Sequence, residues 1–288
     1  MKRALVTLAL LVMPSLARAD EPKTEPKKEP ITRPIELRFD WRIDGPVLGA
    51  LAVTTVGFRL IRDDLEPSYC RICDGDGPGE VNAVDRWFRD ALVRRDTHPA
   101  NVTSYVLAFG AAPLSGAALS VLAAVADERG DEAAADVAMV AEGGFAAMMT
   151  TQVLEAITLR ERPYVHAMSD PDVRRAEIAK TGAFHSFPAG HVVETFGIAA
   201  ASGMVASMRG YRLAPLVWIA GMTIGAATAY TRIAADRHYF TDTLAGAAIG
   251  TVVGGAIPFF FHRPRTRMPA LVAQPVRGGV AFSAGWTL

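Results

Sequence analysis

The sequence of 288 residues lacks a net charge, because 30 lysines and arginines balance 30 aspartates and glutamates. Proteins that bind nucleic acid usually carry a basic excess, so no nucleic-acid partner is expected. Only two cysteines are present, which is too few for a scaffold built on disulfides. The period-two alternation of a β protein is also missing. Since half of the residues are hydrophobic, a disordered chain is excluded as well.

The N-terminus is typical of an export signal. Lys2 and Arg3 precede an apolar run that ends at the small-residue sequence Ala17-Arg18-Ala19. An uncleaved anchor is the alternative, although the run is short for a membrane span. We expect a signal peptide over residues 1–19 and a proline-rich tether over residues 20–44, where 13 of 25 residues are charged. A helical domain over residues 45–262 and a C-terminal tail over residues 263–288 complete the predicted organisation.

Charge is almost absent from a series of long stretches. Residues 101–126 carry none over 26 positions, and residues 213–231 and 243–261 carry none over 19 positions each. Lengths near twenty residues suit helices that cross a membrane, and the abundant Ala and Gly suit close helix packing. The sequence therefore predicts an all-α, membrane-embedded six-helix bundle, preceded at its second helix by a short amphipathic helix over residues 82–95. The six helices are expected near residues 46–61, 102–126, 133–160, 190–208, 213–232 and 241–261, with a short strand near residues 279–282.

Cys70 and Cys73 lie in a glycine-rich loop. In an exported protein, such a pair most simply forms a local disulfide. A redox motif would need a helix starting at the pair, which the following glycines disfavour, and a metal site would need further ligands. A local disulfide is the preferred interpretation, with a metal site as the alternative.

Polar side chains gather where the predicted long helices end or begin. Arg162-Pro163 follows the third helix, His191 opens the fourth, and Arg232, His238 and Asp242 span the turn from the fifth to the sixth. Alternating helix directions bring all of these ends to the same side of a bundle. Arginines, histidines and a helix N-terminus, without a cage of carboxylates for a metal, are suited to binding a phosphate. A carboxylate four residues after His238 can orient its ring, and Thr241 is the expected N-cap of the sixth helix.

These groups resemble the motifs of the type 2 phosphatidic acid phosphatase and vanadium haloperoxidase superfamily, whose pattern is K-x6-R-P, then P-S-G-H, then S-R-x5-H-x3-D. Arg162-Pro163 ends the first block, Pro188-Ala189-Gly190-His191 forms the second, and Thr231-Arg232, His238 and Asp242 form the third. Three ordered blocks at family spacings are a specific signal.

The resemblance implies a phosphatase that needs no cofactor or metal. His238 would attack phosphorus and form a phosphohistidine, Asp242 would orient it, and His191 would protonate the leaving group and then activate water. Arg162, Arg232 and the Gly190 N–H would hold the phosphoryl oxygens, where charge builds in the transition state.

Two positions depart from the family pattern. Glu155 stands where the pattern has lysine, and because seven residues make nearly two helical turns, it shares a helix face with Arg162. Ala189 replaces the serine and removes a hydroxyl donor. Arg237, Arg160 and Lys180 are the candidates to compensate. A pairing of Glu155 with Arg232 would instead tighten a site that holds no substrate. The alternative function is therefore that of a catalytically weak or inactive homologue, which binds a ligand or has a structural role in the membrane.

The expected substrate is a phosphorylated lipid, an isoprenoid phosphate or another small phosphate ester, cleaved as a monoester or pyrophosphate, with the lipid and isoprenoid phosphates favoured. Vanadium-dependent haloperoxidase activity and an unrelated transporter are less favoured alternatives. The expected location is the inner membrane with the site facing the periplasm. A soluble periplasmic form is the alternative, since residues 127–136 carry five acids and one arginine against the positive-inside tendency.

Overall fold

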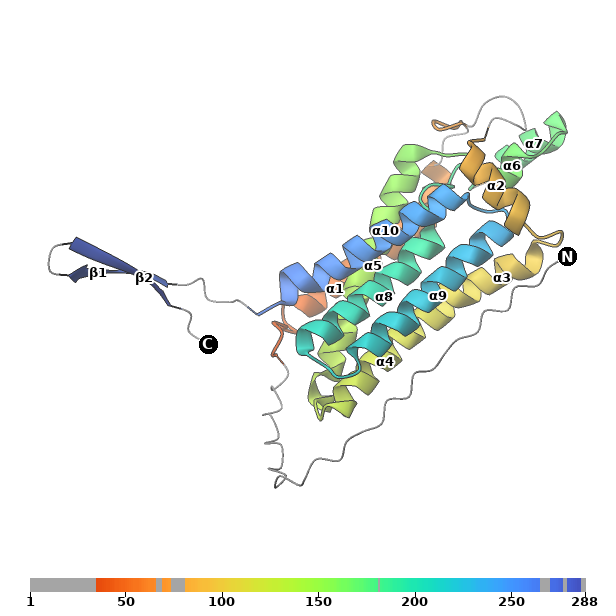
Figure 1. Cartoon of the computed structure of the whole chain (residues 1–288). Helices are drawn as coiled ribbons and strands as arrows, with labels where there is room; N and C mark the ends of the chain where they lie inside the picture. The colour runs from red at the N-terminus through yellow and green to blue at the C-terminus, as the bar shows by residue number, and fades with distance from the viewer. Residues whose placement is uncertain are drawn as a thin grey trace, which may run out of the picture. The chain divides into compact units, whose positions relative to one another are not determined.

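The computed structural model describes residues 35–65, 69–73, 81–180, 182–264, 270–276 and 279–285. The predicted signal peptide and most of the predicted tether lie outside these residues. Long helices dominate the described part of the chain, as the uncharged stretches predict (Figure 1). The long helical segments are α1 (Asp44–Leu65), α3 (His98–Val106) continuing through a π-turn (Leu107–Ala111) into α4 (Ala112–Ala126), α5 (Ala133–Thr158), α8 (Gly190–Arg209), α9 (Ala214–Ala234) and α10 (Phe240–Ile257).

Shorter elements complete the described fold. The predicted amphipathic helix is α2 (Ala83–Leu92), whereas α6 (Pro163–His166) and α7 (Pro171–Ile178) were not predicted, because their segment is polar and broken by proline. A short 3-10 turn (Gly130–Glu132) precedes α5, and a π-turn (Pro258–His262) extends α10. The predicted strand belongs to β2 (Gly279–Gly285), which pairs antiparallel with β1 (Ala270–Val276).

Helix α8 is the centre of the bundle and packs against α4, α5, α9 and α10 (Figure 1). Its contact with α10 depends on glycine: a Cβ on Gly254 would lie 2.1 Å from the carbonyl oxygen of Gly197, so a larger residue would force the helices apart. Successive long helices alternate in direction. The end of α5, the start of α8, the end of α9 and the start of α10 therefore meet at one end of the bundle, as predicted.

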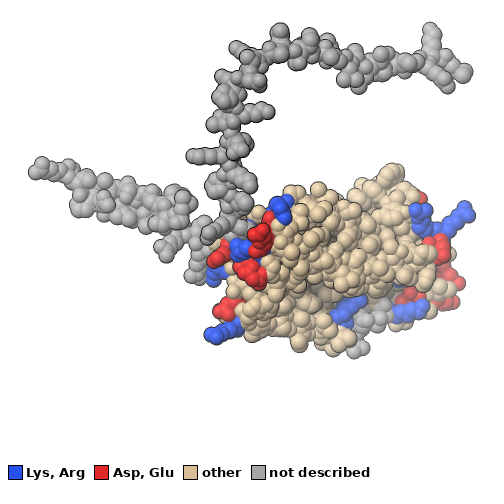
Figure 2. Space-filling model, turned by 90° about the horizontal axis from the view of Figure 1, so that it is seen from below, with Lys and Arg blue, Asp and Glu red and all other residues tan. Residues whose placement is uncertain are grey.

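Within the part of the chain that the structure describes, four helical segments are long and apolar enough to cross a membrane: Asp44–Arg62, His98–Ala126, Gly130–Thr158 and Phe240–His262. Large apolar side chains such as Val53, Leu114, Ile219 and Val252 are exposed on the outside of the bundle. On the face shown in Figure 2, charged residues gather toward two ends of the helical body and leave a broad uncharged band between them. Such a surface is suited to lipid and not to water, and the chain is a membrane protein.

Candidate active site

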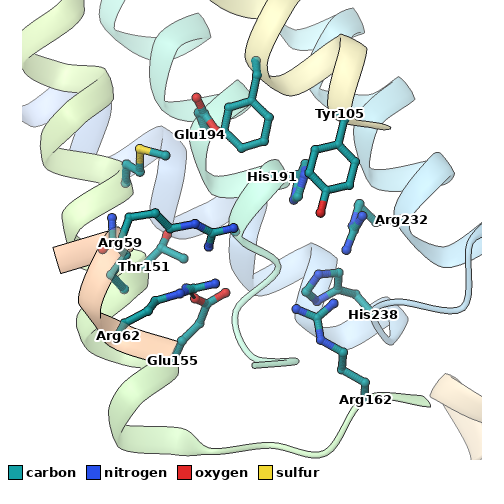
Figure 3. Close-up of a pocket in the computed structure, with 14 residues that line it drawn as sticks. Arg59, Arg62, Tyr105, Thr151, Glu155, Arg162, His191, Glu194, Arg232 and His238 are labelled. Atoms are coloured by element: carbon teal, nitrogen blue, oxygen red, sulfur yellow. Dashed lines mark hydrogen bonds and ion pairs between the residues drawn. The ribbon is translucent and has the colours of Figure 1, made fainter. Parts of the chain in front are cut away.

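A pocket lies at the end of the bundle where α5 and α9 end and α8 begins, with α1 and α3 forming its other walls (Figure 3). It brings together five of the residues predicted for a phosphate site, His191, His238, Arg162, Arg232 and Gly190. In Figure 3 both histidines lie on one side of the pocket with Arg162 and Arg232, while Arg59, Arg62 and Glu155 lie across from them. The remaining lining residues are Tyr105, Phe109, Met148, Thr151, Gln152 and Glu194.

His238 lies in the turn between α9 and α10, and it is only 2% exposed. Its Nδ1 is 2.7 Å from the carbonyl oxygen of Ser186. A carbonyl can only accept, so Nδ1 carries the proton and Nε2 presents its lone pair. Burial, followed by the charges of Arg232 and Arg162, holds the pKa of His238 well below 6.5. The imidazole is therefore neutral at pH 7, which is the form that can act as a nucleophile.

His191 lies in the first turn of α8. Tyr105 and Phe109 contact its ring in T-shaped geometry, with centroids 4.6 and 5.1 Å away. These aromatic walls fix the ring plane. Its Nε2 is buried and has no hydrogen-bond partner in the described structure. A buried polar atom of this kind is costly unless a ligand or water satisfies it, so this nitrogen is placed to form a hydrogen bond with a molecule bound in the pocket.

Arg162 and Arg232 are held only by neutral acceptors in the described structure. Arg162 donates from Nε to the carbonyl oxygen of Gly182 at 2.6 Å, and Arg232 donates from Nη1 to Asn101 Oδ1 and Ser104 Oγ at 3.1 and 3.0 Å. The Nε of Arg232 has no hydrogen-bond partner among the described residues. Burial lowers the pKa of Arg162. Because neither guanidinium has a carboxylate bonded to it, an anion in the pocket would relieve a buried positive charge.

Asp242 does not form the predicted direct bond to His238. It was expected to bond His238 directly, but its carboxylate accepts hydrogen bonds from Ser186 Oγ at 2.6 Å, the Tyr239 N–H at 2.9 Å and Arg160 Nη1 at 2.5 Å. The Ser186 side chain is thus fixed by Asp242 while its carbonyl fixes His238. Asp242 is therefore linked to His238 through Ser186 and not by a direct hydrogen bond.

The N-terminus of α8 faces the pocket through Gly190 and His191. Ala189 is the N-cap residue and provides no side-chain cap, so the serine hydroxyl of the family pattern is indeed missing. The Ala189 N–H is instead used to bond the carbonyl of Asp242 at 3.1 Å. The helix end still offers its dipole and backbone donors to an anion.

Glu155 lines the pocket, as its spacing from Arg162 predicts, but its partner was not foreseen. It forms a buried ion pair with Arg62 at the end of α1, and not with Arg232. Arg59, one turn earlier on α1, lines the same pocket. The sequence held a signal for this pair, because Arg59 and Arg62 end an uncharged helix and lie three residues apart, on one face.

The compensating cations suggested by the sequence do not line this pocket. Arg160 is bound to Asp85 and Asp242 and stacks on Tyr239, and Lys180 pairs with Glu177 at 2.5 Å on the surface. Arg237 stacks on Tyr164 and lines an adjoining polar pocket, which is also lined by Arg59, Arg62, Arg162 and Arg232. Arginine side chains therefore line both the pocket that holds the histidines and the pocket beside it.

Two other expectations concern residues outside the pocket lining. The expected cap Thr241 is not the N-cap of α10; that position belongs to Tyr239, and Thr241 instead donates from its N–H and hydroxyl to Asp85 at 2.8 and 2.7 Å. The reason is that Asp242 is the acid at N3 and reaches back to the Tyr239 N–H. Cys70 and Cys73 form a disulfide, with Cα atoms 5.6 Å apart.

Comparisons with known proteins show what this chain is similar to. Residues 137–265 match the family model of the PAP2 superfamily, which covers both histidines and both pocket arginines of the motif. A stretch of 72 residues is 35% identical to a lipid A 1-phosphatase of Porphyromonas gingivalis, and it spans 25% of this chain and 15% of that protein. A transmembrane PAP2-type phosphatidylglycerolphosphate phosphatase from Bacillus subtilis aligns over 75% of this chain and 94% of its own, at 14% identity and a TM-score of 0.44. The matched segment holds the three motif blocks, and this part of the chain is similar to the PAP2 superfamily.

Proposed function

We propose that this protein is a phosphatase that hydrolyses lipid phosphates through a phosphohistidine on His238. The observation that carries the proposal is the single pocket in which a neutral, oriented histidine, a second histidine and two arginines without carboxylate partners face one another. Positive charge for the transition state comes from the guanidinium groups, so the reaction needs no metal ion.

The proposed reaction has two displacements. Nε2 of His238 attacks phosphorus, the bond from phosphorus to the leaving oxygen breaks, and His191 gives its proton to that oxygen. His191 then removes a proton from water, whose oxygen attacks the phosphohistidine, and the P–N bond breaks to release inorganic phosphate and neutral His238. Arg162, Arg232 and the N-terminus of α8 hold the phosphoryl oxygens throughout.

An apolar pocket supports a lipid substrate. It lies between α4, α5 and α8 and shares Met148 and Glu194 with the catalytic pocket. Its other lining residues are Pro113, Ala117, Val137, Val140, Ala141, Gly144, Phe145 and Ile198. A phosphate in the catalytic pocket would place an attached acyl or isoprenyl chain within reach of this surface. The adjoining arginine-rich pocket leaves room for a pyrophosphate in place of a monoester.

Phosphate release by the detergent-purified protein tests the proposal. We expect turnover of a long-chain lipid phosphate that survives a metal chelator and exceeds turnover of a short soluble monoester. His238→Ala should abolish turnover, while His98→Ala, an exposed histidine outside the pocket, should leave it unchanged. Equal turnover in wild type and His238→Ala would refute the mechanism.

We further propose that the protein lies in the inner membrane with the pocket on the periplasmic side. The segment before α1 would then be cytoplasmic, because the Ile35 N–H bonds the Arg209 carbonyl at the opposite end of the bundle. In this orientation residues 1–19 would not be a cleaved signal. Cysteines introduced at Asp172 and Asp131, at opposite ends of the bundle, distinguish the orientations. A membrane-impermeant maleimide should label only the first in cells whose outer membrane is permeable.

A further inference from the structure

The position of the family's phosphate-binding lysine is occupied by Glu155, yet the pocket has not lost its cation. Arg62 reaches Glu155 from α1, which is 93 residues away in sequence. The side chains of this pair are 10% and 6% exposed, respectively, so both charges are largely removed from water. A buried carboxylate without a partner would be strongly destabilising, and this explains why the two residues meet. It does not explain why they meet in the pocket.

The place where they meet is the wall opposite His238 and Arg162 (Figure 3). Glu155 Oε1 lies against the N-terminus of α8, since a Cβ placed on Gly190 would be 3.2 Å from it. Arg62 lines both the catalytic pocket and the adjoining cationic pocket. The carboxylate thus fixes the guanidinium at the edge of the proposed phosphate position.

Arg62 is not the sole cation that α1 brings to this wall. Arg59 lines the same two pockets as Arg62. Arg59, Arg62 and Glu155 together carry one net positive charge, as the single lysine of the pattern does, and Glu194 of α8 is a further carboxylate of this pocket. A guanidinium also presents several donors in a planar fork, a geometry that matches the oxygens of a phosphoryl group.

We propose that Arg62 binds the phosphoryl group in place of the motif lysine, and that Glu155 is a positioning residue which holds Arg62 there. This inference rests on the proposed function for its substrate, but it concerns phosphate binding and can be tested separately. According to this proposal, the replacement of lysine by Glu155 does not remove a phosphate-binding cation from the pocket. A cation from a different helix, Arg62 of α1, takes the place of the lysine.

The decisive comparison uses Arg62→Ala, Arg62→Ala with Glu155→Gln, and Arg62→Ala with Glu155→Lys. Each is measured for binding of inorganic phosphate by calorimetry, for kcat/KM, and for thermal unfolding in detergent. If Arg62 contacts phosphate, the neutral double variant stays weaker than wild type by about 10- to 100-fold in phosphate affinity, the factor of one hydrogen bond to a charged group. The Glu155→Lys double variant, which rebuilds the family arrangement, regains most of that loss. Arg175→Ala, on an exposed pair with Asp172, is the matched control and should change nothing.

A purely structural pair gives the opposite result. If Arg62 serves only to neutralise Glu155, removing both charges restores wild-type phosphate affinity, and this outcome overturns the inference. Wild-type protein that binds no phosphate overturns it as well. Phosphate binding that depends on Arg62 in a protein without lipid phosphatase activity would refute the proposed function and leave this inference standing. Lipid phosphatase turnover that does not change when Arg62 is replaced would refute this inference and leave the proposed function standing.

Discussion

A buried arginine lies at each end of helix α8, but the hydrogen-bond partners of the two arginines differ. At its C-terminal end Arg209 is fully buried and bonded to Asp136 at 2.9 Å and to Glu132 at 2.8 Å, and the Tyr211 hydroxyl donates to the same Asp136 at 2.8 Å. Near its N-terminal end, Arg232 of α9 is 2% exposed, and among the described residues it is bonded only to neutral oxygens. A closed ion network stabilises structure, whereas an arginine without a carboxylate partner favours binding of an anion.

The largest expected effect is on stability at the closed end. Arg209→Ala should lower the free energy of unfolding by about 3–5 kcal/mol, because it leaves Asp136 buried without its counter-charge. Thermal unfolding in detergent measures the loss. The combined change Arg209→Met and Asp136→Leu should recover much of it, and kcat of the folded fraction should stay at the wild-type value. A strong loss of kcat in folded Arg209→Ala protein would contradict the division between the two ends.

The open end should respond in activity and not in stability. Arg232→Ala is expected to reduce kcat/KM by about 10²- to 10³-fold, the range for removing one preorganised donor from a transition-state anion. Its melting temperature should change little, since no carboxylate is left unpaired. Arg232→Lys should recover part of the activity because it keeps the charge but loses the fork geometry. A large fall in melting temperature with unchanged kcat/KM would assign Arg232 to structure instead.

A smaller effect should be seen in the response to acid. Burial, then the charges of Arg62, Arg162 and Arg59, lowers the pKa of His185 to about 3. The folded protein then leaves His185 neutral while the unfolded chain binds a proton below about pH 6.5, so stability is lost as pH falls from 6.5 toward 3. His185→Gln should remove about 2 kcal/mol of the acid destabilisation at pH 5. Thermal unfolding at pH 5 and pH 8 tests this, and an unchanged difference between the two pH values would refute the low pKa.

The residues that the sequence identified are those whose roles depend on neighbours along the chain. The uncharged stretches predict the long helices, and the three motif blocks predict which helix ends meet around His191 and His238. The roles of Ser186 and Arg62 could not be predicted in this way. Ser186 acts through a backbone carbonyl, which no residue type reveals, and Arg62 reaches Glu155 only because α1 packs beside α5.

The same distinction explains the misplaced cap at Thr241 and the two unpredicted short helices. Tyr239 is the N-cap because its N–H donates a hydrogen bond to the Asp242 side chain, while the Thr241 N–H donates to Asp85 on α2. Helix α7 begins with Asp170 capping the N–H groups of Asp172 and Val173, a local signal hidden in a polar stretch. Local patterns therefore account for the elements, and long-range pairing decides the details of the site.

The central claim is that a lipid phosphate bound at the N-terminal end of α8 transfers its phosphoryl group to His238. Rapid quenching during turnover of a lipid phosphate, followed by mass spectrometry under conditions that preserve phosphohistidine, tests it most directly. The account predicts a phosphoryl group on the peptide that contains His238, which is absent in His238→Ala and accumulates in His191→Ala if attack of water becomes slow. Steady turnover without any phosphorylated His238, or with phosphate on another residue, would contradict it.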